Sequence, residues 1–282
     1  MNKFENIDIY TADPCVAMDM VARTPWDHYV PPYEVVSGVY SVSGIEWVSS
    51  FLIDTGDGLI LIDTGLHESV YLLIDSIYRL GFKLNDIRMI LLSHMHSDHA
   101  NGARALAELT HAKVYMSKRD MPLLNEKKLM YCNENYTYGD LQPENFYEDE
   151  PIISLGNIRI ETVPTPGHTP GTTSFFFEVS DNVHGKLNVG MHGGLGLNTM
   201  SREYLEDAGF PLSLRDEYKA SLDQLDLRQV DVSLISHNGH HNMIEQLPQK
   251  TETFNPYIDD QVWHKLLGKY KAAINDLIKH DP

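Results

Sequence analysis

The chain has 282 residues, with 42% hydrophobic and 22% charged side chains, which excludes a small disulfide scaffold and a largely disordered chain. Its 40 acidic and 22 basic side chains give a formal net charge of -18, so we expect no nucleic-acid partner, because that charge repels phosphate backbones. Cys15 and Cys132 stand far apart in the sequence and form no CxxC pair, so we expect two unpaired thiols.

The N-terminal segment begins MNKFENIDIY and lacks the unbroken apolar stretch of a secretory signal. No segment reaches the roughly 18 apolar residues that a membrane-spanning helix needs. We therefore expect a cytoplasmic protein with no membrane partner. Residues 1–35 are expected to form an extension that packs on a single domain over 36–282, because no Pro/Ser/Gly-rich linker divides the rest of the chain.

Short apolar runs from about 36 to 63 predict a meander of strands, and apolar residues at helical spacing predict a helix over 67–80. The continuously apolar run 88–92 predicts a buried strand that delivers His94 at its carboxyl end. A helix over 100–110 and a strand over 112–117 follow. This order predicts an α/β fold, in which ligands bind at the carboxyl ends of strands.

Residues 125–150 mix acidic and aromatic side chains without sustained periodicity, which predicts a long irregular insertion. It could be a lid over a site or an ordinary solvated excursion. Apolar runs predict further strands at 151–155, 157–163, 172–179, 186–191 and 230–236, and helical spacing predicts helices near 213–226 and 255–280.

Three imidazoles and one carboxylate fall within six positions directly after the predicted strand, at His94, His96, Asp98 and His99. Neutral imidazole and carboxylate are ligands that suit Zn²⁺ and similar divalent metals. Alternation in an extended loop would send His94 and His96 to one side, while Asp98 and His99 on the following turn address a neighbouring point. The cluster is therefore expected to serve two metals.

Two more histidines follow predicted strands in turn-rich loops, His168 within TPGHTPG and His237 before Asn238. Beside the cluster, both are expected to be metal ligands. Asp63 ends a strand and is a candidate acceptor for the free N–H of a metal-binding histidine. The alternative is that Asp63 or Thr64 caps the following helix.

These motifs resemble those of the metallo-β-lactamase superfamily over about residues 36–241. The resemblance rests on the HxHxDH motif at 94–99 and on Asp63-Thr64-Gly65, His168 and His237, which come in the family's order. It implies a four-layer αββα sandwich with a dimetal cleft at one edge. It also implies two ligand sets: His94, His96 and His168 for one metal, and Asp98, His99 and His237 for the other.

The segments HTPGTTSFF and LISHNG look most like those of the subclass B3 β-lactamases and their non-lactamase relatives. Many superfamily hydrolases carry a bridging Asp where this chain has Met191-His192, so bridging is expected to fall to water or hydroxide. Side-chain alternation predicts that Met191 or His192 faces the cleft. His192 would then be an extra ligand or a substrate contact, the alternative being that it rests against the protein.

The resemblance implies a dinuclear zinc-dependent hydrolase, with Fe or Mn as alternative metals. A metal-activated hydroxide would cleave a small acyl substrate, a lactam, lactone, amide or ester. Asp98 would be both ligand and catalytic residue, because it would orient the hydroxide. Two alternatives stay open: a true B3-type β-lactamase and a metal-binding relative without turnover. The expected partner is a small-molecule substrate, no organic cofactor site is predicted, and the oligomeric state is left open.

Overall fold

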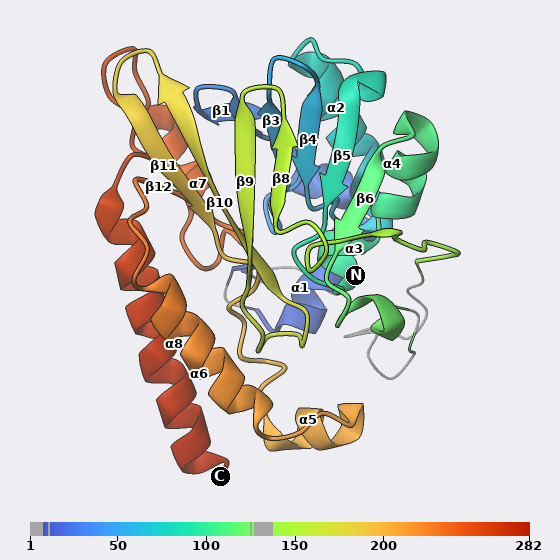
Figure 1. The fold of residues 1–282 in the computed structure, drawn as a ribbon, viewed down its shortest axis with the longest axis vertical. Coiled ribbons are helices and arrows are strands. Elements are labelled where there is room, and N and C mark those ends of the chain that lie inside the picture. The colour runs from blue at the N-terminus through green and yellow to red at the C-terminus, as the bar shows by residue number, and fades with distance from the viewer. Residues whose placement is uncertain (1–7, 11, 125, 127–137) are drawn as a thin grey trace.

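The computed structural model describes residues 8–10, 12–124, 126 and 138–282. Two β-sheets face each other, with α2 and α4 outside one and α6 and α8 outside the other (Figure 1). The predicted αββα sandwich is therefore confirmed. No helix in the described part of the chain is long and apolar enough to cross a membrane.

The first sheet has seven strands in sequence order. They are β1 (Tyr33–Val36), β2 (Val39–Ser41), β3 (Phe51–Asp54), β4 (Leu59–Ile62), β5 (Ile87–Leu91), β6 (Lys113–Met116) and β7 (Asn145–Phe146). Strands β4, β5 and β6 run parallel, so their carboxyl ends meet at one edge of the sheet. The continuously apolar sequences of β4 and β5 suit strands covered on both faces.

Short helices connect and cover these strands. They are η2 (His67–Ser69), α2 (Val70–Arg79), η3 (Leu84–Asp86), α3 (Ser97–Ala100), α4 (Ala103–Thr110) and η4 (Met121–Leu123). Helix α2 shows why the sequence forms an amphipathic cover: Leu73 and Ile77, four residues apart, are buried in the core, whereas Tyr71 and Tyr78 are exposed.

The second sheet has the strand order β12-β11-β10-β9-β8. Its strands are β8 (Ile152–Leu155), β9 (Ile158–Pro164), β10 (Thr173–Asp181), β11 (Gly185–Met191) and β12 (Val232–Leu234), and the helices of this half are α5 (Arg202–Ala208), α6 (Leu214–Leu225), α7 (Met243–Gln246), η6 (Leu247–Gln249) and α8 (Asp260–His280). Trp263 fixes α8 on this half. It is fully buried, and its Nε1 donates a hydrogen bond to the Leu225 carbonyl oxygen at 2.9 Å.

The N-terminal part contains α1 (Pro14–Arg23) and η1 (Pro25–His28). Helix α1 starts at a side-chain cap, because Asp13 accepts hydrogen bonds from the first backbone N–H groups, and its buried face includes Met18. Cys15 is disulfide-bonded, so the expectation of an unpaired thiol there is wrong. Cys132 lies outside the described residues.

Most of the predicted insertion, residues 125 and 127–137, lies outside the described residues. The part from 138 to 150 includes β7 and two buried tyrosines, Tyr138 and Tyr147. The hydroxyl of Tyr147 donates to the carbonyl oxygens of Leu92 and Tyr115, each at 3.0 Å. This portion therefore packs against the first sheet through its buried tyrosines.

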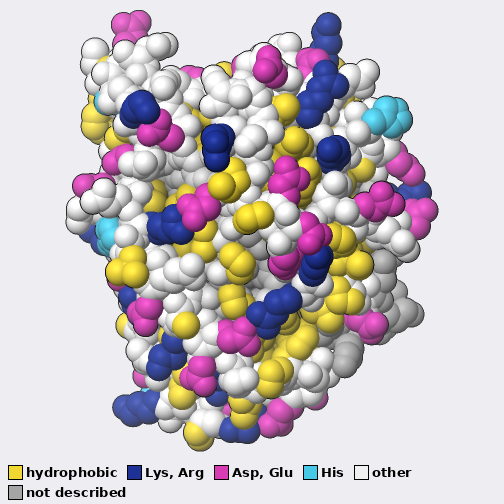
Figure 2. All heavy atoms as spheres, in the orientation of Figure 1, with side chains coloured by type: hydrophobic (Ala, Val, Ile, Leu, Met, Phe, Trp, Pro, Cys, Tyr) yellow, Lys and Arg dark blue, Asp and Glu magenta, His cyan; other side chains and the backbone are white. Residues whose placement is uncertain are grey.

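On the face shown in Figure 2, Lys and Arg side chains are scattered among Asp and Glu side chains, with apolar groups between them. The excess of acidic over basic residues in the sequence is therefore not gathered into one patch of either sign on this face.

Candidate metal centre

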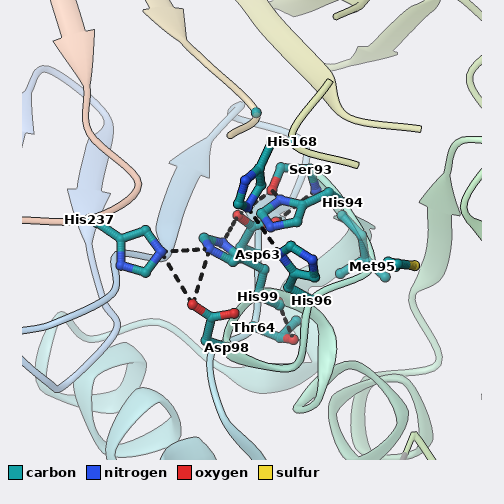
Figure 3. Close-up of polar contacts among 12 residues, drawn as sticks. Asp63, Thr64, Ser93, His94, Met95, His96, Asp98, His99, His168 and His237 are labelled. Atoms are coloured by element: carbon teal, nitrogen blue, oxygen red, sulfur yellow. Dashed lines mark hydrogen bonds and ion pairs between the residues drawn. The ribbon is translucent and has the colours of Figure 1, made fainter. Parts of the chain in front are cut away.

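The carboxyl end of β5 leads directly into the site. His94 and His96 lie on the loop after this strand, and Asp98 and His99 lie on the single turn of α3. The turn is tied to the end of β4, because the Thr64 N–H and hydroxyl both donate to the His99 carbonyl oxygen, at 2.7 and 2.9 Å. This link fixes the position of α3 relative to the parallel strands (Figure 3).

The first triad consists of His94, His96 and His168. Their ligand nitrogens lie within 4.8 Å of one another, and His96 Nδ1 is 3.0 Å from His168 Nε2. All three side chains are buried. Burial lowers the pKa of His168 to about 4 and holds the pKa values of His94 and His96 well below the ordinary value. The rings are therefore neutral at physiological pH, which is the form that binds metals.

The second triad consists of Asp98, His99 and His237, which also meet within 4.8 Å. His237 Nε2 lies 3.0 Å from His99 Nε2 and 3.2 Å from Asp98 Oδ2. Burial raises the pKa of Asp98, but the neighbouring His99 and His237 outweigh it and hold that pKa below its ordinary value. This triad therefore offers one carboxylate and two imidazoles, whereas the first offers imidazoles alone.

Asp63 connects the two triads. Its Oδ2 lies 2.8 Å from His99 Nδ1 and accepts a hydrogen bond from the Ser93 hydroxyl at 2.7 Å, while Oδ1 accepts from the Ser93 N–H at 2.8 Å. The backbone of Asp63 is left-handed, with φ of 58°. The alternative role as a helix cap is wrong, because the following helix has Leu66 at its cap position and no side-chain cap hydrogen bond.

These contacts fix which nitrogen of three rings carries the proton. A carboxylate and a carbonyl oxygen only accept, so His99 Nδ1 donates to Asp63, and His168 Nδ1 donates to the Gly196 carbonyl oxygen at 2.7 Å. The Ser93 hydroxyl gives its proton to Asp63 and therefore accepts from His94 Nδ1, at 3.0 Å. In His94 and His168, whose pKa values are lowered by burial, Nε2 is left with a lone pair that points into the centre. Burial lowers the pKa of His99, but the carboxylates of Asp98 and Asp63 outweigh it and raise that pKa, so metal binding at this ring would displace a proton.

The donor set therefore fits divalent metals. His94 Nε2 is buried and has no hydrogen-bond partner among the described residues. Lone pairs that converge over a few ångströms repel one another unless a cation lies among them, and imidazole and carboxylate are the usual ligands of Zn²⁺.

Asp120, between β6 and η4, is a site residue that the sequence reasoning missed. Its Oδ2 accepts hydrogen bonds from the Met95 N–H at 2.9 Å and the Thr169 hydroxyl at 2.7 Å, and its Oδ1 accepts from the Gly171 N–H at 2.6 Å. One buried carboxylate thus joins the loop of His94 and His96 to the loop of His168. In the sequence SKRD, Asp120 looks like an ordinary surface acid. The only local signal for a role in the site is its position shortly after a strand that ends at residue 116.

Neither Met191 nor His192 lines the cavity around the triads, which corrects the expectation that one of them faces the cleft. Both are fully buried, and the His192 ring lies against His240 and Trp263, with centroid distances of 5.8 and 6.4 Å. The alternation argument fails because Gly193 and Gly194 follow. A Cβ at Gly194 would lie 2.5 Å from the His168 ring, so glycine backbone occupies this edge of the site.

The cavity over the triads has a volume of about 260 Å³, and all six triad residues line it. Its other walls are formed by the N-terminal segment together with Trp47, by the turn at 194–198, and by the side chains of His240 and Tyr270. A cavity of this size admits a small molecule or one end of a larger one.

A family model described as "Metallo-beta-lactamase superfamily" matches residues 47–184. Among solved structures, BJP-1, a subclass B3 metallo-beta-lactamase of Bradyrhizobium japonicum, has a TM-score of 0.82 and 25% identity, covering 93% of this chain and 98% of that chain. Native FEZ-1 metallo-beta-lactamase from Legionella gormanii has a TM-score of 0.81 at 24% identity, covering 90% and 97%, which supports the fold alone.

Among curated proteins, the uncharacterized protein YobT of Bacillus subtilis (strain 168) is 30% identical over 160 residues, 54% of this chain and 66% of YobT. The N-acyl homoserine lactonase AiiA of Bacillus thuringiensis subsp. kurstaki is 26% identical over 167 residues, 47% of this chain and 58% of AiiA. The chain thus spans less than two thirds of the length of these curated relatives.

Proposed function

We propose that this chain, of which residues 47–184 match the metallo-β-lactamase superfamily, is a dinuclear, zinc-dependent hydrolase that cleaves a small acyl substrate, a lactam, lactone, amide or ester. One observation carries the proposal. The rings of His94, His99 and His168 each direct Nδ1 outward to a fixed acceptor, which turns Nε2 of each ring inward. Such rings are prepared for metal binding before any metal arrives.

His94, His96 and His168 would hold one cation, and Asp98, His99 and His237 would hold the second. The mixture of imidazole and carboxylate favours Zn²⁺, with Fe or Mn as alternatives. When bound, two such cations lower the pKa of water toward about 7 and polarise a substrate carbonyl.

The protein's own residues would then orient the reactants. Asp98 stays ionised, and we propose that it accepts a hydrogen bond from the attacking water as well as binding the second cation. Asp63, Ser93 and the Gly196 carbonyl hold the imidazoles in one tautomer and one orientation, so little rearrangement accompanies the reaction.

A true B3-type β-lactamase is the second candidate, favoured by the likeness to BJP-1 over 93% of the chain. A specific feature argues against it as the main activity: among the described residues that line the cavity, none is Lys or Arg, so none pairs with the carboxylate of such an antibiotic. The remaining alternative is a relative that binds metal without turnover.

The deciding experiment assays the chain, equilibrated with Zn²⁺, against a chromogenic cephalosporin, lactones, amides and esters, with thioesters and phosphodiesters as further classes. Each is measured with and without a chelator, together with elemental analysis. We expect close to two metals per chain and chelator-sensitive hydrolysis of an acyl substrate. Full metal loading without hydrolysis of any compound would favour the non-catalytic relative, and at most one bound metal would contradict the dinuclear site.

Two observations on the compartment point in opposite directions. The sequence predicts a cytoplasmic location, whereas the disulfide at Cys15 is typical of oxidising compartments, because cytosolic disulfides are rare. Alkylation of the denatured protein from its native cells, with and without prior reduction, distinguishes the two.

A further inference from the structure

One side of the cavity, next to the second triad, has an apolar wall formed mainly by the N-terminal segment. Ile9, Tyr10, Pro14, Met18 and Trp47 line it, and we call these five residues the N-terminal wall. Ile9, Met18 and Trp47 are at most 7% exposed and pack in one apolar cluster, so the wall is a formed surface.

The N-terminal wall is held in place relative to the second triad. The Trp47 ring lies edge-on to the His237 ring, with centroids 5.1 Å apart, and the neighbouring Asn238 N–H donates to the Trp47 carbonyl oxygen at 3.2 Å. On the other side, the hydroxyl of Ser97, next to Asp98, contacts Met18 Sδ at 3.6 Å. A group seated on this wall therefore lies beside the candidate reaction centre.

The wall is also uncharged. The Tyr10 hydroxyl donates to Glu46 Oε2 at 3.1 Å, and it stays protonated because burial and this carboxylate raise its pKa above the ordinary value. No Lys or Arg occurs among the described residues that line the cavity. Lys269 is near the opposite end, where its Nζ lies 5.7 Å from the ring centre of Tyr270, but it does not line the cavity.

We propose, on the basis of the hydrolase function above, that the substrate is uncharged and carries an apolar alkyl or aryl group, which packs against the N-terminal wall while its scissile carbonyl lies at the triads. Apolar surface gains free energy when it leaves water for such a wall. A charge on the same group would lose its hydration without gaining a partner of opposite sign.

The test uses the full chain loaded with Zn²⁺ and 4-nitrophenyl esters from acetyl to decanoyl, with the chelator-treated rate subtracted. We expect kcat/KM to rise about fourfold for each methylene along the shorter members, the value for burial of one methylene group, and then to level off. Ile9→Ser should flatten this rise, and Ile9→Leu should preserve it. Leu109→Ser, on the exposed face of α4, is the matched control and should leave the whole series unchanged.

Two further arms keep the proposal testable if Ile9→Ser fails to fold. Straight-chain alkanols from ethanol to octanol should inhibit the unaltered enzyme competitively, more tightly as they lengthen. Replacing the terminal methyl of a long ester by a carboxylate should lower kcat/KM at least about tenfold. Hydrolysis of the acetyl ester with no dependence on length, or equal rates for the carboxylated ester, would overturn this inference alone. Failure to hydrolyse any ester, lactone, lactam or amide would overturn the hydrolase function itself.

Discussion

The two triads differ in how the rest of the chain holds them. The first triad is neutral and buried, and Asp120 joins the two loops that carry it. The second contains a carboxylate, and the side chains of Asp98 and His237 keep 12% and 19% of their surface exposed. In the proposed hydrolase, this difference would divide the work: the first triad would hold its metal firmly, and the second, beside the cavity wall, would meet water and substrate.

The largest effect is expected at Asp98, in the open triad. Asp98→Asn should lower kcat/KM by at least about 100-fold, because the amide is a weaker ligand without charge and no longer orients water. Elemental analysis should still find the metal of the first triad. Asp57→Asn, the same change at an exposed position, is the control. Near-normal turnover of Asp98→Asn would place the chemistry elsewhere.

The next effect is expected at Asp63, which supports both triads through Ser93 and His99. Asp63→Asn puts an amide where three donors now converge, so we expect about a 10- to 100-fold loss in metal affinity or activity. Competition with a chromogenic chelator measures the affinities of the two sites. If the affinities of both sites stayed unchanged, the carboxylate of Asp63 would hold the backbone at Ser93 without tuning the metal-binding rings.

Asp120 joins the two loops that carry the first triad, and its protonation makes the stability of the fold depend on pH. Burial raises the pKa of Asp120 to about 6 against the ordinary 3.8, so the folded state binds this proton more tightly than the unfolded state does. The contribution of Asp120 to stability is therefore full below about pH 4 and is lost as pH rises through 6.

We accordingly expect the free energy of unfolding of the unaltered protein, relative to Asp120→Asn, to be larger at pH 5 than at pH 7.5 by roughly 1 to 1.5 kcal/mol. Urea unfolding of both proteins at both pH values measures the difference. Because both carry the same histidines, effects of histidine protonation cancel in the comparison. A difference that does not change with pH would show that Asp120 does not titrate in this range.

The smallest effect on activity is expected at His192, which belongs to neither triad. Its two ring nitrogens are buried without a hydrogen-bond partner among the described residues. His192→Leu removes this desolvated polar ring, so turnover should change less than about twofold and thermal stability should be equal or higher. Loss of the second metal in this variant would show that His192 does contribute to the metal centre.

The features that depend on local apolar runs could be predicted from the sequence, whereas contacts between distant residues could not. The ends of β5, β9 and β12 could be predicted from local apolar runs, and with them the positions of His94, His168 and His237 in the loops that follow. The bonds of Asp120 to Met95, Thr169 and Gly171 are between residues far apart in the sequence, so no local pattern marked them.

Other features were missed although a local sequence signal marks them. Helix α1 was not predicted, although Asp13 followed by Pro14 is a typical helix start. The expectation for residues 191 and 192 treated the strand as if it continued, whereas the two glycines that follow take the chain past His168. The N-terminal wall could not be foreseen, because it depends on how Ile9 and Met18 pack against Trp47 across the fold.

The left-handed backbone at Asp63 limits what can replace this residue during evolution or in a designed variant. Glycine adopts that conformation readily but brings no carboxylate, and glutamate brings the carboxylate at the end of a longer chain and with a penalty for positive φ. Aspartate alone combines a short carboxylate with tolerance of the left-handed region. Selection for activity from a library randomised at this position should therefore return aspartate almost exclusively.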